Sequence, residues 1–193
     1  GGFPILSEDD YSKIGLRDNL KELADRIHKH DAKICLQINP GSKWIEYNLN
    51  KDMVNAFSEK DIKSMVDNIA EVAKAAKESG IDAVEINGSG GNLLDQFHTE
   101  MWNNRIDSYG GNLENRFKFS IECIEKIKST CGEDYPILFI FTPYHGTKEG
   151  TQISEGIKMS RILEKTGIDG LHIDIGYYDT WYKSIDTVYQ EEP

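Results

Sequence analysis

Four short apolar runs, separated by amphipathic segments, constrain the fold of this chain more than any other feature of its sequence. The runs are rich in β-branched residues and span 33–39, 83–87, 137–141 and 170–174. Runs of this length that are apolar on both faces are typical of parallel strands covered by helices. We therefore predict an α/β fold in which four strands form one parallel sheet.

The segments around these runs carry apolar residues at helical spacing. Four helices are marked by Leu20 to Ile27, Ile62 to Ala73, Phe117 to Ile127, and Ile157 to Leu163. Ser58 and Asp61 have the spacing of a capping box before the second helix. Gly167 is placed to end the fourth.

The connections differ in length at the two ends of the predicted sheet. Each helix returns to its next strand within a few residues, past Gly80, Gly132 or Gly167. The chain after each strand runs much longer, over 41–57, 88–113, 142–153 and 175–193. Long loops at the carboxyl ends of parallel strands mark the functional side of a β/α barrel, but a doubly wound sheet shares this property. The pattern leaves both architectures open.

The length of 193 residues predicts a single domain over 1–193. A closed (β/α)₈ barrel needs eight strands and ~250 residues, whereas four strands are predicted here. An unclosed sheet leaves two edges that pair readily with further strands. We therefore expect a piece of a broken barrel, a homodimer, or a partner chain that completes the barrel.

The composition of the chain indicates which classes of partner it is not suited to bind and which cellular compartment fits it. A net charge of −11 argues against binding to nucleic acid or an anionic membrane, and no apolar run reaches the ~18–20 residues of a membrane span. Three cysteines without a C-x-x-C pattern predict neither a zinc site nor disulfides, which favours the cytoplasm.

The remaining polar residues suggest no metal site. His172 and Asp174 share one face of the last strand, where we expect hydrogen bonds within the sheet rather than a metal ion. His98 and Glu100 are expected at the surface.

The stretch 105–116 holds two arginines, two acidic residues and a Tyr-Gly-Gly turn. Such a composition suits a long loop held by charge-assisted hydrogen bonds. The stretch resembles the loop after the fourth strand of the Old Yellow Enzyme family, flavin-dependent (β/α)₈ barrels that reduce activated C=C bonds. The resemblance continues from about Gly2 to the end. It implies a partial TIM barrel of about four βα units, similar to units three to six. It also implies that the matching residues of 105–116 hold this loop in place and start the next helix.

Within the family, the chain looks most similar to the 2-enoate and 2,4-dienoyl-CoA reductase branch. The residues that carry this likeness are Asp95, Gln96 and Phe97, together with Asp179, Thr180, Trp181 and Tyr182. The resemblance implies FMN as cofactor and NAD(P)H as reductant. Gln37 matches the glutamine that binds the flavin pyrimidine. Asn87 takes the place of the first substrate-binding histidine, and Asn92 takes the place of the tyrosine that donates a proton.

Other positions depart from the family pattern. Pro40 and Lys43 stand where the family has a histidine and an arginine, and Gly90 replaces a second polar group. Ile140 replaces the arginine that faces the anionic edge of the flavin, so a cation there would have to come from Lys43 or His145. The family's phosphate-binding loops follow strands seven and eight, beyond the four strands predicted here.

We expect an FMN-dependent NAD(P)H oxidoreductase of the ene-reductase type, or a fragment of one, acting on small molecules such as enoates or enoyl thioesters. The alternative is a catalytically degenerate member that binds a ligand or a protein.

Overall fold

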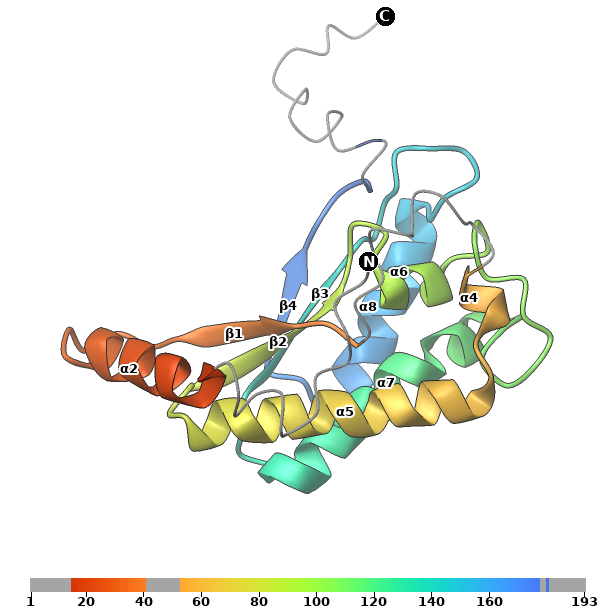
Figure 1. The fold of residues 1–193 in the computed structure, drawn as a ribbon. Coiled ribbons are helices and arrows are strands. Elements are labelled where there is room, and N and C mark those ends of the chain that lie inside the picture. Colours follow the sequence, from red (N-terminus) through yellow and green to blue (C-terminus); the bar gives the residue numbers. More distant parts are fainter. Residues whose placement is uncertain (1–14, 41–52, 178–179, 181–193) are drawn as a thin grey trace, which may run out of the picture.

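A computed structural model describes residues 15–40, 53–177 and 180 (Figure 1). The strands β1 (Cys35–Ile38), β2 (Ala83–Gly88), β3 (Ile137–Phe141) and β4 (Gly170–Ile173) pair in parallel. The predicted α/β fold and its four strands are confirmed. Asp179, Trp181 and Tyr182, which contribute to the family likeness, lie outside the described residues.

The order of the strands decides between the two architectures. The sheet runs β1-β2-β3-β4, so every strand is added on the same side of the one before it. A doubly wound sheet reverses its strand order near the middle. The sequential order, with each crossover through a helix, is that of a barrel segment.

Six helices are described. They are α2 (Leu16–His28), α4 (Met53–Ala56), α5 (Glu59–Glu78), α6 (Leu93–His98), α7 (Leu113–Cys131) and α8 (Ile153–Lys165). The predicted helices correspond to α2, α5, α7 and α8. Helices α4 and α6 lie in segments predicted as loops, because four and six residues are too few to show a helical period.

The ends of α5 and α8 follow the predicted signals. The backbone N–H of Asp61 donates to Ser58 Oγ (3.2 Å), and the N–H of Ser58 donates to Asp61 Oδ2 (2.8 Å). These bonds complete the capping box, and hydrogen bonds from Ser58 lower the pKa of the Asp61 carboxyl. Helix α8 ends at Lys165, and Gly167 follows with a φ of 72°, which glycine adopts without steric cost.

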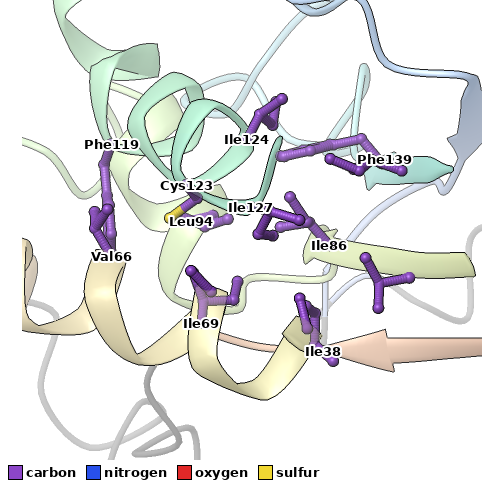
Figure 2. Close-up of a cluster of buried hydrophobic side chains, with 14 of the residues drawn as sticks. Ile38, Val66, Ile69, Ile86, Leu94, Phe119, Cys123, Ile124, Ile127 and Phe139 are labelled. Carbon is purple, nitrogen blue, oxygen red and sulfur yellow. The ribbon is translucent and has the colours of Figure 1, made fainter. Parts of the chain in front are cut away.

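The apolar core lies on one face of the sheet (Figure 2). Ile38, Ile86 and Phe139 come from three neighbouring strands and meet Ile69 of α5 and Ile127 of α7, all buried. Side chains alternate between the two faces of a strand. The residues between these core positions therefore lie on the opposite face.

Two Gly-Ile-Asp turns fasten successive strands at their amino ends. The Asp82 N–H donates to Ile34 O (3.0 Å), while the Ile34 N–H donates to Asp82 Oδ2 (2.9 Å). Asp169 makes the same two bonds with Ile137, both 2.9 Å long. At each position one aspartate both accepts from and donates to the strand before it, which fixes the start of the pairing register.

Candidate functional site

Polar side chains gather on the sheet face opposite the helices, which we call the polar face. Its residues are Gln37 of β1, Glu85 and Asn87 of β2, Ile140 of β3 and His172 of β4. In the register of the sheet, Gln37 is opposite Glu85. Asn87 is opposite Ile140, which is itself opposite His172. The site therefore consists of two adjacent rows across the sheet.

Four of these side chains and Asn92 form one connected polar network. Asn92 Nδ2 donates to Asn87 Oδ1 (3.2 Å), and Asn87 Nδ2 donates to Gln37 Oε1 (3.1 Å). Gln37 Nε2 donates to Glu85 Oε2 (2.7 Å), and the ring Nδ1 of His172 lies 3.0 Å from Glu85 Oε1. A carboxylate only accepts, so Nδ1 of His172 carries a proton. Every donor in the network thus points toward Glu85.

The structure brings together the three residues that the sequence predicted for the site. Gln37, Asn87 and Asn92 come from three separate segments and are linked by direct hydrogen bonds. Their roles toward a cofactor or a substrate remain predictions. Glu85 is the member that sequence reasoning missed. Its alternation with Asn87 and its place opposite Gln37 are the signals that indicate it.

Asn92, which stands at the position of the family's proton-donating tyrosine, fixes the orientation of the Asn87 side chain. It immediately precedes α6 but its side chain does not cap that helix. Its Nδ2 instead donates to Asn87 Oδ1 (3.2 Å) and to Ser89 O (2.9 Å). The Ser89 N–H also donates to Asn87 Oδ1 (3.1 Å). An amide has no readily released proton, so Asn92 holds Asn87 in orientation and is no general acid.

Ile140 leaves an apolar position in the middle of the polar face. It is only 7% exposed and lies between Asn87 and His172 in the register. Two residues are candidates for the source of a cation there. Lys43 lies outside the described residues, and His145 does not reach Ile140, because its ring is buried among other partners.

His145 is buried and bound on both ring nitrogens. The Thr151 N–H donates to Nδ1 (2.9 Å), so the proton is on Nε2, which donates to Asp95 Oδ2 (3.1 Å). Asp95 Oδ2 also accepts from the Gly91 N–H (2.7 Å). The ring of Trp102 packs edge-on against His145 at 5.5 Å. This pair ties α6 to the loop after β3 and is buried away from the site.

The prediction of hydrogen bonding at His172 is confirmed by its contact with Glu85, whereas the surface position predicted for His98 is wrong. His98 is buried, its Nε2 lies 2.7 Å from Ser120 Oγ, and its ring stacks on Phe117 at 3.9 Å. Burial lowers the pKa of His98 to about 3, so the ring is neutral. Glu100 is exposed, as predicted.

The predicted structural role of the 105–116 loop is confirmed. Arg105 donates to the carbonyl oxygens of Val54 and Phe57, both at 2.7 Å. Arg116 is 2% exposed and donates to the carbonyls of His98 (2.7 Å) and Gly111 (2.8 Å). It also contacts the carboxylates of two other segments, Glu100 and Glu155. The two arginines hold the loop against α4, α6 and α8.

Within the described ranges, no three His, Cys, Asp or Glu side chains are grouped so that they could hold a metal ion. None of the described helices is both long and apolar enough to cross a membrane. All three cysteines, Cys35, Cys123 and Cys131, are free.

Comparisons with known proteins extend these observations. The NADH:flavin oxidoreductase / NADH oxidase family matches residues 15–188. The chain is 33% identical to a cinnamate reductase of Clostridium sporogenes, over 89% of this chain and 30% of that protein. It is 29% identical to an NADH oxidase of Thermoanaerobacter brockii, over 82% of this chain and 27% of that protein. The chain thus spans less than a third of these curated relatives.

Solved structures agree on the fold. A 2-naphthoyl-CoA reductase in complex with 2-naphthoyl-CoA matches with a TM-score of 0.76 at 22% identity, over 91% of this chain and 30% of that one. The Old Yellow Enzyme from Pichia sp. AKU4542 matches with a TM-score of 0.70 at 21% identity, over 88% of this chain and 52% of that one. The four-stranded sheet therefore has the fold of part of a TIM barrel.

Proposed function

The chain belongs to the NADH:flavin oxidoreductase / NADH oxidase family, and from this premise we propose that it forms the flavin- and substrate-facing part of an FMN-dependent NAD(P)H ene reductase. The observation that carries the proposal is the polar network at the carboxyl ends of β1 and β2. Three side chains expected at a flavin and its substrate, Gln37, Asn87 and Asn92, are connected there by hydrogen bonds. In barrels, this is the side where ligands bind.

The donors and acceptors on the polar face fit the edge of a flavin ring. Gln37 uses one N–H toward Glu85 and one acceptor position toward Asn87. Its amide keeps a second N–H and a second lone pair, which match the alternating groups of the pyrimidine edge. Ile140, on the neighbouring strand, is apolar and almost fully buried. Bound FMN would supply hydride transfer from NAD(P)H to an activated C=C bond.

Asn87 would orient and polarise the substrate. One N–H of its amide is used on Gln37, and the second is available to a carbonyl oxygen. A fixed donor at such an oxygen stabilises the negative charge that develops there during reduction. Ser89 and Asn92 both bond Asn87 Oδ1, so the amide is held in place before a substrate arrives.

We propose enoates or enoyl thioesters as substrates. Support comes from two similar proteins whose names specify their substrates: cinnamate is an unsaturated carboxylate, and 2-naphthoyl-CoA is an aromatic thioester. Both place a carbonyl next to an unsaturated carbon, which is the arrangement that a donor such as Asn87 would activate.

Further strands are needed to close the barrel around this site. β1 and β4 each have a described partner on one side only, and apolar side chains are exposed beside β4. These are Leu171 and Ile173 of the strand and Ile153 and Ile157 of α8. We propose that more of the same polypeptide, a second copy, or a partner chain covers them. The three free cysteines support a reducing compartment such as the cytoplasm.

A catalytically degenerate binding protein is the second candidate. Two observations favour it. The buried Ile140 stands at the position where the family has an arginine beside the flavin. The amide of Asn92, at the position of the proton-donating tyrosine, forms a hydrogen bond with Asn87 instead. Asn92→Tyr and Ile140→Arg restore the family residues. Reductase activity that appears only in the double variant would favour a degenerate member.

An FMN titration of the purified chain, followed by flavin fluorescence, tests the main proposal. Saturable binding is expected, and Gln37→Ala should weaken it. Asn19→Ala removes an exposed amide on α2 and should leave binding unchanged. Protein that binds is then assayed with NADH, NADPH, enoates and enoyl thioesters without oxygen. Absence of saturable binding would contradict the flavin function, whereas binding without turnover would favour the second candidate.

A further inference from the structure

The polar face has an unbalanced charge. Glu85 places a carboxylate in the middle of the network, and Ile140 removes the arginine expected beside the flavin. A flavin becomes more negative on reduction, so an uncompensated carboxylate opposes that reduction. A positively charged group is therefore required near Ile140 if this face serves a flavin.

His172 is placed to meet this requirement. It is directly opposite Ile140 in the β3–β4 register, and its side chain is 56% exposed. Among the described strand residues on this face, it is the only side chain that can carry a positive charge. Its Nδ1 is bound to Glu85, and no hydrogen bond is described for Nε2 within residues 15–40 and 53–177.

We infer that His172, oriented by Glu85, supplies the positive charge and the hydrogen bond at the anionic edge of the flavin that the family obtains from an arginine on the neighbouring strand. The inference rests on the proposed flavin function and assigns one part of it to a new residue on β4. Glu85 has the role of a positioning residue: it fixes the ring by Nδ1, so that Nε2 is the nitrogen left for a ligand.

The groups around His172 allow its charge to be tested alone. Glu85 faces it from β2. The β3 residues on this face, Leu138 and Ile140, are apolar. On the chain of β4 itself, Asp174 is two residues further on, and its Oδ1 accepts from the Ile175 N–H (2.8 Å). Two carboxylates and no other described cation thus accompany the ring.

A histidine at this position makes flavin binding depend on pH in a way that an arginine does not. Histidine side chains gain their charge between about pH 8 and pH 5, whereas arginine stays charged throughout. The protonated ring attracts the anionic edge of the flavin. Binding should therefore tighten as the pH falls through this interval.

The experiment measures the Kd of FMN at about pH 6 and pH 8, two values within the interval over which histidine side chains change their charge. The variants are His172→Gln, His172→Lys and the control His30→Gln, which removes an exposed histidine beyond α2. We expect wild type and the control to bind roughly three- to fivefold more tightly at the lower pH, the effect of one partly solvated charge. His172→Gln should bind more weakly and lose this response, and His172→Lys should bind tightly at both values.

A second variant adds a readout that a merely structural role would not change. Ile140→Arg in the His172→Gln background should restore binding and make it independent of pH. The midpoint potential of the bound flavin should fall in His172→Gln and recover in that double variant. A His172→Gln protein that keeps the full pH response and potential would overturn this inference and leave the flavin function standing. Wild-type protein without saturable FMN binding would overturn both.

Discussion

The 105–116 loop and the polar face are both held by hydrogen bonds between polar side chains, but they use these bonds differently. In the loop, the side chains of Arg105 and Arg116 are buried and donate both to backbone carbonyls and to carboxylates. On the polar face, Gln37 and Asn87 bond other side chains and lie partly exposed. A buried donor to a carbonyl cannot be released without cost, whereas a side-chain pair at a surface can exchange its partner for a ligand.

The difference shows where stability and binding reside in this molecule. Substitutions in the loop should change the free energy of unfolding, and substitutions on the polar face should change ligand binding with little effect on folding. Each prediction below tests one side of this contrast.

Arg116→Leu should have the largest effect. It removes the donor to the His98 and Gly111 carbonyls and leaves Glu155 without its partner. We expect a loss of about 3–5 kcal/mol, because two carbonyl acceptors lose their donor, at about 1–3 kcal/mol for each unsatisfied buried group, and the packing of the buried Arg116 side chain changes as well. Urea denaturation followed by circular dichroism measures it.

Arg26→Leu is the control for Arg116→Leu. Arg26 forms an ion pair with Glu22 in which both side chains are largely exposed. Such pairs contribute little, so its denaturation midpoint should match wild type. Equal losses in the two variants would contradict the special role of the loop arginines.

Gly110→Ala should be the next most damaging change. A Cβ at Gly110 would lie 2.1 Å from the Arg105 carbonyl oxygen, so the backbone of the loop must move. We expect a loss of about 2–3 kcal/mol from this overlap, measured by thermal unfolding. Gly170→Ala on β4 would bring its Cβ no closer than 3.5 Å to Leu138. A comparable loss in that variant would show that the close approach at Gly110 is not the cause.

His98 predicts how stability depends on pH. Burial lowers its pKa to about 3 from an ordinary 6.5, so the unfolded chain binds this proton first as the pH falls. The contribution is complete above about pH 6.5 and is lost toward pH 3, at up to about 1.4 kcal/mol per pH unit. Between about pH 6.5 and pH 5 we expect a loss of about 2 kcal/mol, measured by urea denaturation.

The interval near pH 5 to 6.5 isolates His98 from the acidic residues. The pKa values of Asp61, Asp82 and Asp107 are lowered by their hydrogen bonds, so their contributions are lost only below about pH 4. His98→Gln should flatten the curve in this interval and His30→Gln should not. If the free energy of unfolding depends on pH equally in both variants, the proton taken up on unfolding belongs to a group other than His98.

Gln37→Ala should have the smallest effect on folding. It breaks two bonds of the polar network but leaves the core intact, so a loss below about 1 kcal/mol is expected. The same variant should weaken FMN binding clearly, as measured by fluorescence titration. A large loss of stability with unchanged binding would reverse the contrast between the two regions.

The sequence predicted the sheet and its four main helices because their signals are local: β-branched runs, helical spacing and the Ser58 capping box. It also predicted that Gln37, Asn87 and Asn92 belong to one site. It did not predict the burial of His98 or His145, since their partners Ser120 and Asp95 lie 22 and 50 residues away in the chain. Nor did it assign Glu85, whose importance depends on the pairing register of β1 and β2.

The two Gly-Ile-Asp turns have a consequence for synthesis on the ribosome. Each aspartate bonds a strand that left the ribosome earlier: Asp82 bonds Ile34, 48 residues before it, and Asp169 bonds Ile137, 32 residues before it. A nascent chain can secure the start of one strand only after the next turn has emerged. The barrel segment is therefore suited to assembly in steps of one unit, from the amino terminus onward, while translation continues.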